Sequence, residues 1–482
     1  MKNVKDQAAR ILFFLVLGYV LLPAPIIVPL ENDEIRIALG AARHGASGQR
    51  DMDYRYDVQP GAYLLAEWVA RGLGLGTHEA LSWISIVSVV VFLLSSSLVV
   101  GRWLGVDFGV VGLAAFLFPE SFTAAYYGSS SAPSAACLWL ALLTFGESRA
   151  RALGAGAVMG LAVWFRADAL LLAPALWLLP GATRRRSVEA TLALVASTVF
   201  AFVASGASFF KVVGDYESHA AAPIEGITIV SQLIATSTLG GAALACVGAV
   251  GMVRVSAHRR VMLAAIPTVL AYLPNLASPK YLLAVLPFLS ALAVLGGLSV
   301  IRAHSSERTQ PASPRKQRRR APSANVSDEK ASRARHRWAL PLVGVLLFAQ
   351  YLIPAPSALG PEPRVRTADG PRPFLALAAA PVAWLDQKRR LQRDEAAAIA
   401  RLLAVASRPG GLVTVAGIRS AELVPYRLIS AGFELTSNQS LRNHRELRFV
   451  RGSANVVVAI FSPTREGLEE YQRGRAGIFV SD

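Results

Sequence analysis

Cysteine is nearly absent from this chain, and charge is sparse. The 482 residues include two cysteines, Cys137 and Cys246, and 17% of the residues are Asp, Glu, Lys or Arg. Both cysteines lie inside apolar runs, so the sequence supports neither a disulfide framework nor a cysteine metal site, and simple packing is the favoured role for both. The seven histidines are scattered without the spacing of metal ligands. These absences argue against a disulfide-rich secreted module.

Apolar residues, by contrast, are abundant and clustered. They make up 53% of the chain and fall in long runs that an ordinary soluble enzyme does not contain. A membrane span needs about 20 predominantly apolar residues. On that criterion the sequence predicts an all-α polytopic membrane protein with about eleven transmembrane helices, some of them short. We place these helices near residues 11–30, 81–101, 106–119, 132–146, 152–165, 168–180, 188–210, 227–253, 261–275, 281–301 and 338–357.

The basic residues indicate which ends of the spans face the cytoplasm. Lys2, Lys5 and Arg10 precede the first apolar run, which has no clear cleavage site, so we expect an uncleaved anchor with a cytoplasmic N-terminus. Every second connection is then basic, as the positive-inside rule requires. The net charge of +17 therefore reflects topology rather than nucleic-acid binding. The basic connections contain Arg102, Arg149, Arg151, Arg184, Arg185, Arg186, Arg254, Arg259 and Arg260.

Composition divides the chain into four parts. Residues 1–301 form a transmembrane core with an external loop at 31–80. Residues 302–337, rich in Arg, Ser and Pro, predict a disordered basic cytoplasmic linker, which suits contact with anionic lipid better than nucleic-acid binding. Residues 338–357 form the last span, and 358–482 predict a small extracytoplasmic α/β domain. Its expected helices lie at 393–407 and 420–431, and its expected strands at 412–415 and 455–461.

The acidic pair Asp33 and Glu34 stands at the external end of the first span. At helical spacing Asp33 shares a face with Ile37, Gly40 and His44, which predicts a helix along the membrane surface. A nearby apolar phase raises the pKa of a carboxylate, and this suits Asp33 to act as a general base. An acidic helix start favoured by the helix dipole is an equally weighted alternative on local sequence.

Asp57 and Gln59 precede a second predicted surface helix, in which Pro60 occupies an early position and Asp57 is a candidate cap. We expect this helix to flank Asp33, which makes Asp57 and Gln59 candidates for substrate binding. The alternative is a helix that lies at the membrane–water interface and has no role in substrate binding. Its expected apolar face consists of Tyr63, Leu64, Leu65 and Trp68.

The next external segment reads PESFTAAYYGSSSAPSAA. Glu120 supplies a second carboxylate at the outer surface, where it can assist Asp33 or hold a sugar hydroxyl. Tyr126 and Tyr127 are also candidates for substrate contact, although a role in the interfacial aromatic belt is the favoured alternative for both.

Two later segments place cations at external span ends. Arg166 and Asp168 interrupt an otherwise apolar stretch, which predicts a tight external turn with Arg166 available to a phosphate. Lys280 and Tyr281 open the tenth span, where an ammonium suits a lipid phosphate and snorkelling to the interface is the alternative.

Taken in order, these segments resemble a known superfamily. The acidic pair, the helix that QPG begins, YYGSSSAPS, FRADALLLAP and SPKYLLAVLPFL are together similar to the GT-C glycosyltransferases over about residues 1–300. The protein O-mannosyltransferase and aminoarabinose transferase type enzymes resemble this pattern most. The histidine-containing motifs of eukaryotic protein mannosyltransferases are lacking, which argues against a protein acceptor.

The resemblance implies a fold, a reaction and a set of roles. It implies inverting transfer of a sugar from a polyprenyl-phosphate donor, with Asp33 as the catalytic residue and Glu34 beside it. Glu120 matches a second external acidic position, and Arg166 and Lys280 correspond to basic positions that meet the lipid phosphate.

The sequence therefore predicts a membrane glycosyltransferase, of the mannosyl- or a related hexosyltransferase kind, in a bacterial cytoplasmic (inner) membrane. The active site and the C-terminal domain are expected on the extracytoplasmic side. Expected partners are a polyprenyl-phosphate-linked sugar, a glycan, lipid or protein acceptor, and membrane lipids, but no nucleic acid. No cofactor or metal site is assigned, and dependence on a divalent metal stays open. The alternatives are a transporter or lipid-linked sugar flippase, and a non-catalytic scaffold.

Overall fold

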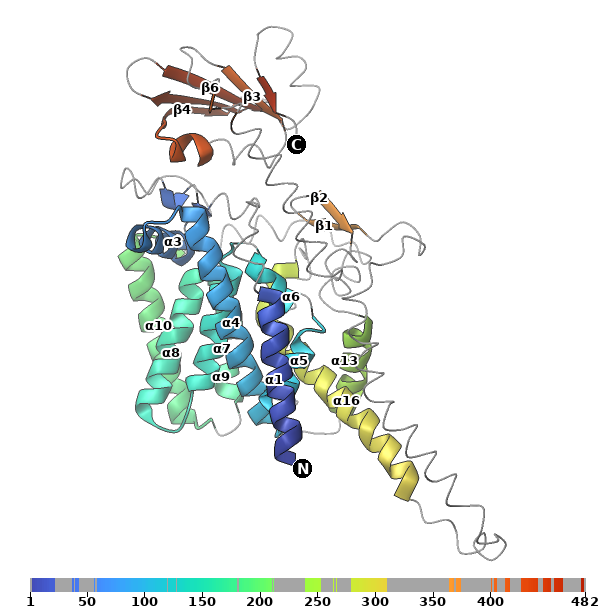
Figure 1. Cartoon of the computed structure of the whole chain (residues 1–482). Helices are drawn as coiled ribbons and strands as arrows, with labels where there is room; N and C mark the ends of the chain where they lie inside the picture. The colour runs from blue at the N-terminus through green and yellow to red at the C-terminus, as the bar shows by residue number, and fades with distance from the viewer. Residues whose placement is uncertain are drawn as a thin grey trace, which may run out of the picture.

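The computed structural model shows a bundle of helices with a β-sheet beyond one end of it (Figure 1). The expectations for Asp33, Glu34, Asp57 and Tyr127 lie outside the residues that it describes. Those residues are 2–21, 37–38, 40–42, 56, 59–118, 120–126, 128–179, 182–209, 211, 239–252, 263, 266, 279–309, 364–367, 370–373, 400, 403–404, 412–416, 426–440, 445–451, 455–462 and 478–480.

Helix α4 (Thr77–Leu104) is the longest described helix, and its local sequence explains both of its ends. At the start, the Gly76 N–H donates to Glu79 Oε2 at 3.1 Å. At the end, Gly105 adopts a left-handed φ of 65°, which glycine tolerates without steric penalty. The 28 residues between them span about 42 Å at the rise of an α-helix, which is enough to cross a bilayer.

Three described stretches are long and apolar enough to cross a membrane on their own. They are α4, α10 (Arg184–Ser205), and Leu282–Val300, which joins the 3₁₀ helix η5 (Pro279–Val285) to α16 (Leu286–Thr309). Shorter apolar helices include α7 (Ser131–Thr144) and α13 (Leu239–Met252). The predicted span at 338–357 lies outside the described residues, so the total of about eleven stays a prediction.

Glycines allow these helices to approach one another closely. Helix α8 (Arg149–Phe165) packs along α10, and a Cβ built at Gly156 would lie 2.0 Å from the Ala190 carbonyl oxygen. Helices α13 and α16 meet in the same way, since a Cβ at Gly248 would lie 1.8 Å from the Leu292 carbonyl oxygen. Small residues at such crossings are typical of helices that associate within a membrane.

An aromatic cluster joins α4, α7 and α16 in the core. Trp139 is fully buried, and its ring lies 5.8 Å from that of Trp103 and 5.3 Å from that of Phe288. Its indole N–H donates to the Ala284 carbonyl at 2.9 Å, so the polar atom of this buried ring is satisfied. In the same core, α1 (Lys2–Leu21) packs its buried Phe13 against α5 (Phe108–Ala115).

The bundle has two chemically different ends (Figure 1). We call one the basic end: α1, α8 and α10 begin there, α4 ends there, and it carries Arg102, Arg149 and Arg184. We call the opposite end, with α3 (Pro60–Leu73) and Arg166, the distal end. The described basic residues of the predicted cytoplasmic connections thus gather at one end, as the topology requires.

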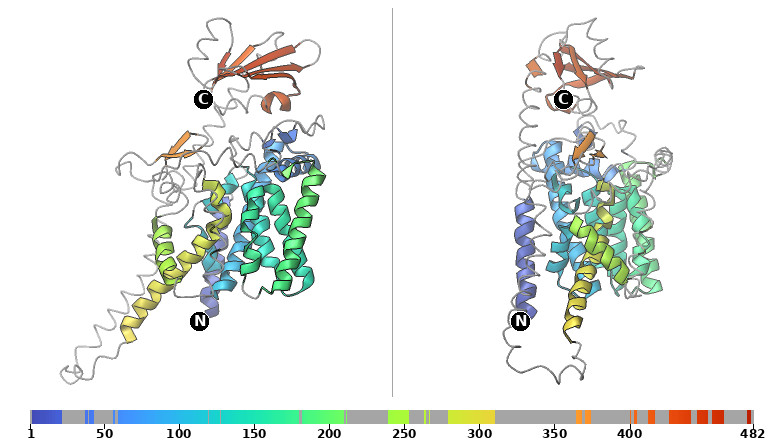
Figure 2. Two further views of the ribbon diagram at one scale, coloured as in Figure 1. Left: turned by 180° about the vertical axis from the view of Figure 1, so that it is seen from behind. Right: turned by 90° about the vertical axis from the view of Figure 1, so that its right-hand side faces the viewer.

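The C-terminal region contains a five-stranded sheet, which lies beyond the distal end (Figures 1 and 2). Strand β6 (Asn455–Ser462) pairs antiparallel with β5 (Arg445–Arg451), which pairs antiparallel with β4 (Glu434–Ser440). On the other side of β6, β3 (Leu412–Ala416) and then β7 (Ile478–Val480) continue the sheet in parallel. Strands β3 and β6 coincide with the two predicted strands.

A separate antiparallel hairpin pairs β1 (Arg364–Thr367) with β2 (Gly370–Pro373). Residues 426–430 are helical, inside the second helix predicted for this region. The expected α/β domain as a whole stays a prediction, because much of 358–482 lies outside the described residues.

Candidate functional site

The turn after α8 holds a partly buried ion pair at the distal end. The helix stops at Phe165, and Arg166 adopts an extended backbone with φ −154° and ψ 117° before the 3₁₀ helix η3 (Ala167–Leu172) begins. Arg166 Nη2 and Nε then donate to the Asp168 carboxylate at 2.8 and 3.0 Å. The side chains are 15% and 9% exposed. The predicted tight turn is therefore confirmed, and the two charges in it face each other.

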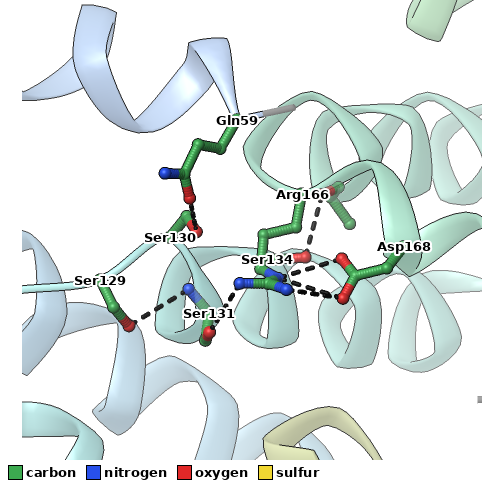
Figure 3. A network of polar contacts seen from close by, with 8 residues as sticks. Gln59, Ser129, Ser130, Ser131, Ser134, Arg166 and Asp168 are labelled. Atoms are coloured by element: carbon green, nitrogen blue, oxygen red, sulfur yellow. Dashed lines mark hydrogen bonds and ion pairs between the residues drawn. The ribbon is translucent and has the colours of Figure 1, made fainter. Parts of the chain in front are cut away.

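Serines at the start of α7 surround this ion pair (Figure 3). Arg166 Nη1 donates to Ser131 Oγ at 3.3 Å, and the Ser131 N–H donates to Ser129 Oγ at 3.3 Å. One turn further along α7, the Ser134 hydroxyl donates to the Ala162 carbonyl of α8 at 2.9 Å. All these serines are buried. The first turn of α7 thereby presents hydroxyls and helix N–H groups next to a guanidinium, which is a chemistry suited to phosphate or sugar oxygens.

Gln59 links this serine cluster to α3, and each residue of the QPG sequence has a physical role. The buried Gln59 amide accepts a short hydrogen bond from the Ser130 hydroxyl, which lies 71 positions later in the chain. Pro60 occupies the first helical position, where its missing N–H is not needed. Gly61 lets α3 lie against α8, because a Cβ there would stand 2.7 Å from the Trp164 ring.

Gln59 is the N-cap residue of α3 and Pro60 is its first helical residue, while Asp57, the expected cap, lies outside the described residues. One expectation about α3 is wrong. The predicted interfacial face is partly internal: Tyr63 and Leu64 are buried, whereas Trp68 is 54% exposed. The helix therefore packs into the protein on the face that was expected to meet lipid.

Glu120 begins the short helix α6 (Glu120–Thr123) and is buried, with 6% of its surface exposed. Helix α6 packs against η5, the 3₁₀ helix that carries Lys280 and Tyr281, and η5 also packs against α7. The elements that carry the predicted acidic and basic residues thus converge at the distal end. Only the backbone is described for Lys280, Tyr281 and Tyr126, the last of which ends the 3₁₀ helix η2 (Ala124–Tyr126).

The sequence interpretation overlooked several distal-end contacts. The Tyr56 hydroxyl donates to the Ser205 carbonyl at 2.9 Å, and Glu67 of α3 pairs with Arg71 at 2.8 Å. His78 of α4 meets Tyr426 of the C-terminal region, with Nδ1 and the hydroxyl oxygen 2.8 Å apart. The serine cluster had a visible signal, a run of three serines directly before an apolar helix, but the contact of His78 with a residue 348 positions away had none.

The described side chains of the site are one guanidinium, carboxylates, hydroxyls and an amide. Within the residues that the structure describes, no group of three or more His, Cys, Asp or Glu side chains is arranged to hold a metal ion. The guanidinium of Arg166 supplies positive charge, and the Asp168 carboxylate offsets the penalty of burying that charge. The serine hydroxyls and the Gln59 amide supply neutral donors and acceptors.

Comparison with solved structures finds two similar chains. The crystal structure of ArnT from Cupriavidus metallidurans bound to undecaprenyl phosphate matches with a TM-score of 0.58 at 16% identity, covering 87% of this chain and 84% of that one. The structure of the same ArnT in the apo state matches with a TM-score of 0.53 at 17% identity and the same coverage. No protein-family model matches the sequence, and a search of curated proteins finds no match.

At these identities the likeness concerns the fold. It extends over most of the chain, beyond the roughly 300 residues on which the sequence resemblance rested. The chain therefore shares the fold of these ArnT structures, while the superfamily, the reaction and its residues are matters for proposal.

Proposed function

We propose that the protein is a membrane glycosyltransferase that transfers a sugar from a polyprenyl-phosphate donor to an extracytoplasmic acceptor with inversion. The donor sugar is mannose or a related hexose, and the acceptor is a glycan, lipid or protein. The distal end faces the extracytoplasmic side of a bacterial inner membrane. The observation that carries this proposal is the likeness in fold, over 87% of the chain, to an ArnT whose crystal structure is bound to undecaprenyl phosphate.

In the proposed reaction the phosphate of the donor is already a leaving group. Asp33 takes the proton of an acceptor hydroxyl, whose oxygen attacks the anomeric carbon of the sugar from the face opposite the phosphate. The bond between that carbon and the phosphate oxygen breaks, and its electron pair leaves with the polyprenyl phosphate. The anomeric configuration therefore inverts, and the departing group carries one more negative charge than it did in the donor.

That developing charge needs positive groups and hydrogen-bond donors near the phosphate. We assign Arg166, with the support of Ser131, to the phosphate, together with Lys280 from η5. Asp168 holds the guanidinium in one orientation through two hydrogen bonds of 2.8 and 3.0 Å, so little reorganisation is needed when the phosphate departs. Gln59 and Glu120 then suit the sugar hydroxyls, because an amide and a carboxylate accept hydrogen bonds that sugars donate.

The distribution of charge favours this proposal over a transporter. Within α4, α7, α8 and α10, the Asp, Glu, Lys and Arg residues stand near the helix ends. A transporter that moves an ion or charged substrate is expected to place ionisable groups in the middle of its spans. A reaction at the membrane surface instead places its charged groups at the ends of spans, and Arg166, Asp168 and Glu120 lie at such ends.

Purified protein supplied with a panel of polyprenyl-phosphate hexoses tests the proposal. Wild type is expected to transfer one of them, and Asp33→Asn to lower turnover by about 10²- to 10⁴-fold, the usual effect of removing a general base. Glu31→Gln is the matched control, because it removes a neighbouring carboxylate to which no role is assigned. Equal turnover by Asp33→Asn and wild type would refute the assignment of the base.

Cells that lack the protein identify the substrate class. Mass spectrometry of their lipid-linked sugars and surface glycans is expected to show an accumulated donor or a truncated glycan. If neither pool changes under conditions where the protein is made in wild-type cells, the proposed reaction is wrong.

A further inference from the structure

A buried tyrosine ring of the C-terminal region contacts the membrane core. Tyr426 is 2% exposed, and its hydroxyl lies 2.8 Å from Nδ1 of His78 at the start of α4. The two rings meet edge to face, with centroids 5.8 Å apart and an interplanar angle of 78°. In Figure 1 the helical turn at 426–430 lies between the sheet and the distal end of the bundle. The contact therefore docks the sheet domain onto the core.

The same cluster also holds a piece of the first external loop. Ile37, Ala38 and Ala41 are buried in one apolar cluster with Tyr426, which also includes residues of α3 and α4. Directly before His78, the Thr77 hydroxyl donates to the Ala38 carbonyl at 3.0 Å. Two consecutive residues of α4 thus hold two segments from distant parts of the chain, the loop and the C-terminal region.

This anchored piece lies close in sequence to the proposed base. Asp33 is four residues before Ile37, and four residues of fully extended chain reach at most about 14 Å. Chain length therefore limits how far the proposed base can stand from the described residues Ile37 and Ala38, which are held next to the start of α4. If that anchor loosens, the base loses its alignment with the acceptor, and small misalignments are enough to slow a reaction.

We propose that Tyr426 is a positioning residue for the transfer reaction: its packing against His78, Ile37, Ala38 and Ala41 fixes the short segment that begins four residues after Asp33. This inference rests on the proposed function, because it takes Asp33 to be the base. The C-terminal region thereby takes part in catalysis without touching substrate. Deleting its docking contact should impair the chemical step and spare the binding of the lipid phosphate at Arg166.

Two variants and one control test this inference in the full-length protein. Tyr426→Ala removes the ring and the hydroxyl, whereas Tyr426→Phe keeps the ring and loses only the hydrogen bond. Thr436→Ala is the control, because it removes a side-chain hydrogen bond to the Arg448 carbonyl within the same sheet. Hydrogen–deuterium exchange of peptides that cover residues 37–42 reports docking without any need for activity. Turnover and the dissociation constant for undecaprenyl phosphate report the consequence.

For Tyr426→Ala we expect faster exchange at 37–42 and a fall in kcat of about tenfold or more, with the dissociation constant unchanged within about twofold. Tyr426→Phe should lie between Tyr426→Ala and wild type, and Thr436→Ala should match wild type. Unchanged exchange at 37–42 in Tyr426→Ala overturns the inference, whatever the activity. Faster exchange with an unchanged kcat also overturns it. Faster exchange in a protein whose wild type transfers no sugar supports the docking role and refutes the proposed function alone.

Discussion

Two arginine–aspartate pairs mark the two ends of the bundle, and they differ in sequence separation and in the exposure of the arginine. At the basic end, Arg10 of α1 pairs with Asp107 at 2.7 Å, across 97 positions of sequence, with the arginine side chain 51% exposed and the aspartate side chain 6% exposed. At the distal end, Arg166 pairs with Asp168 across two positions, and both side chains are largely buried. The first pair links α1 to the connection between α4 and α5. The second pair links two residues that are already close together because they are two positions apart in the chain.

The difference separates a structural contact from a functional one. An ion pair with an exposed arginine, between distant segments, holds those segments together with a modest attraction that salt weakens. A buried pair between near neighbours adds little to the fold, since its desolvation penalty offsets much of its attraction. Its presence is better explained by a need for a guanidinium at that position, kept in one orientation beside the serine cluster. The predictions below test this division.

The largest expected effect is the presence or absence of chemical labelling, which reports which end of the bundle faces the outside of the cell. In a background without Cys137 and Cys246, a cysteine at Ser47 should react with a membrane-impermeant maleimide in intact cells. A cysteine at Ser313, in the basic linker, should react only after permeabilisation. Labelling of both positions from the same side would reverse or destroy the assignment of the distal end to the exterior.

The next largest effect is on turnover. Arg166→Gln removes the charge next to the serine cluster, and we expect sugar transfer to fall by about 10²- to 10³-fold, as when a group that stabilises transition-state charge is lost. Arg10→Gln is the matched variant at the basic end and should leave turnover within about twofold. The measurement is the initial rate with a polyprenyl-phosphate hexose.

An equal loss of turnover in Arg166→Gln and Arg10→Gln would show that the Arg166 pair has no special role in the reaction. The control for binding is the dissociation constant of undecaprenyl phosphate, which should rise for Arg166→Gln and stay constant for Arg10→Gln. A normal dissociation constant and a normal rate in Arg166→Gln would show that the buried guanidinium does not meet the donor.

A smaller effect is expected on stability when the distal pair is broken from its acidic side. Asp168→Asn leaves the largely buried Arg166 without its countercharge. Removal of one partner of a fully buried pair costs about 3–5 kcal/mol, and we expect a smaller loss here because Arg166 is 15% exposed. The double variant Arg166→Gln, Asp168→Asn should recover much of that loss. Thermal unfolding of the purified protein measures both, and a double variant that unfolds below Asp168→Asn would contradict the expectation.

Features that depend on local sequence could be predicted well. The span expected at 81–101 is α4, and the Arg166–Asp168 turn follows from two charges two positions apart in an apolar run. The start of α10 was expected at residue 188, yet the helix begins at Arg184. Thr183 caps it by accepting from the Arg186 N–H at 3.4 Å. The three consecutive arginines from Arg184 suggested a non-helical connection between spans. They can instead form the first turn of a helix, because that turn lies outside the apolar part of the span.

Contacts between distant segments could not be predicted, because no local pattern encodes them. The Ser130–Gln59 hydrogen bond joins residues 71 positions apart, and the docking of Tyr426 on His78 joins residues 348 positions apart. Strand β5 was missed for a different reason. Its sequence RELRFVR alternates as a strand should, but the arginines and the glutamate lower its apolar content. Pairing with β4 on one side and β6 on the other compensates for this.

The smallest effect is expected at Asp107, in the connection between α4 and α5. Burial raises the pKa of this carboxyl, but hydrogen bonds from Arg10 and from the Gly109 N–H lower it, and the net pKa lies below its ordinary value of 3.8. A carboxyl whose pKa is lowered in the folded state stabilises the fold above that ordinary value, and the stabilisation disappears as the pH falls through the lowered pKa.

Asp107→Asn keeps an oxygen that accepts from the Gly109 N–H and loses only the charge. We therefore expect it to lower the melting temperature less than Asp168→Asn does. The difference from wild type should shrink in about 1 M salt, where the screening length is about 3 Å. It should also start to fall as the pH drops below 3.8, and vanish once the pH is below the lowered pKa of the folded carboxyl. Melting curves at low and high salt, and along an acid series, check both trends. If salt changes the loss of melting temperature in Asp107→Asn as little as it changes the loss in Asp168→Asn, the Arg10–Asp107 pair is not a weak, salt-screened contact. The two ion pairs would then differ less than the exposure of their arginines suggests.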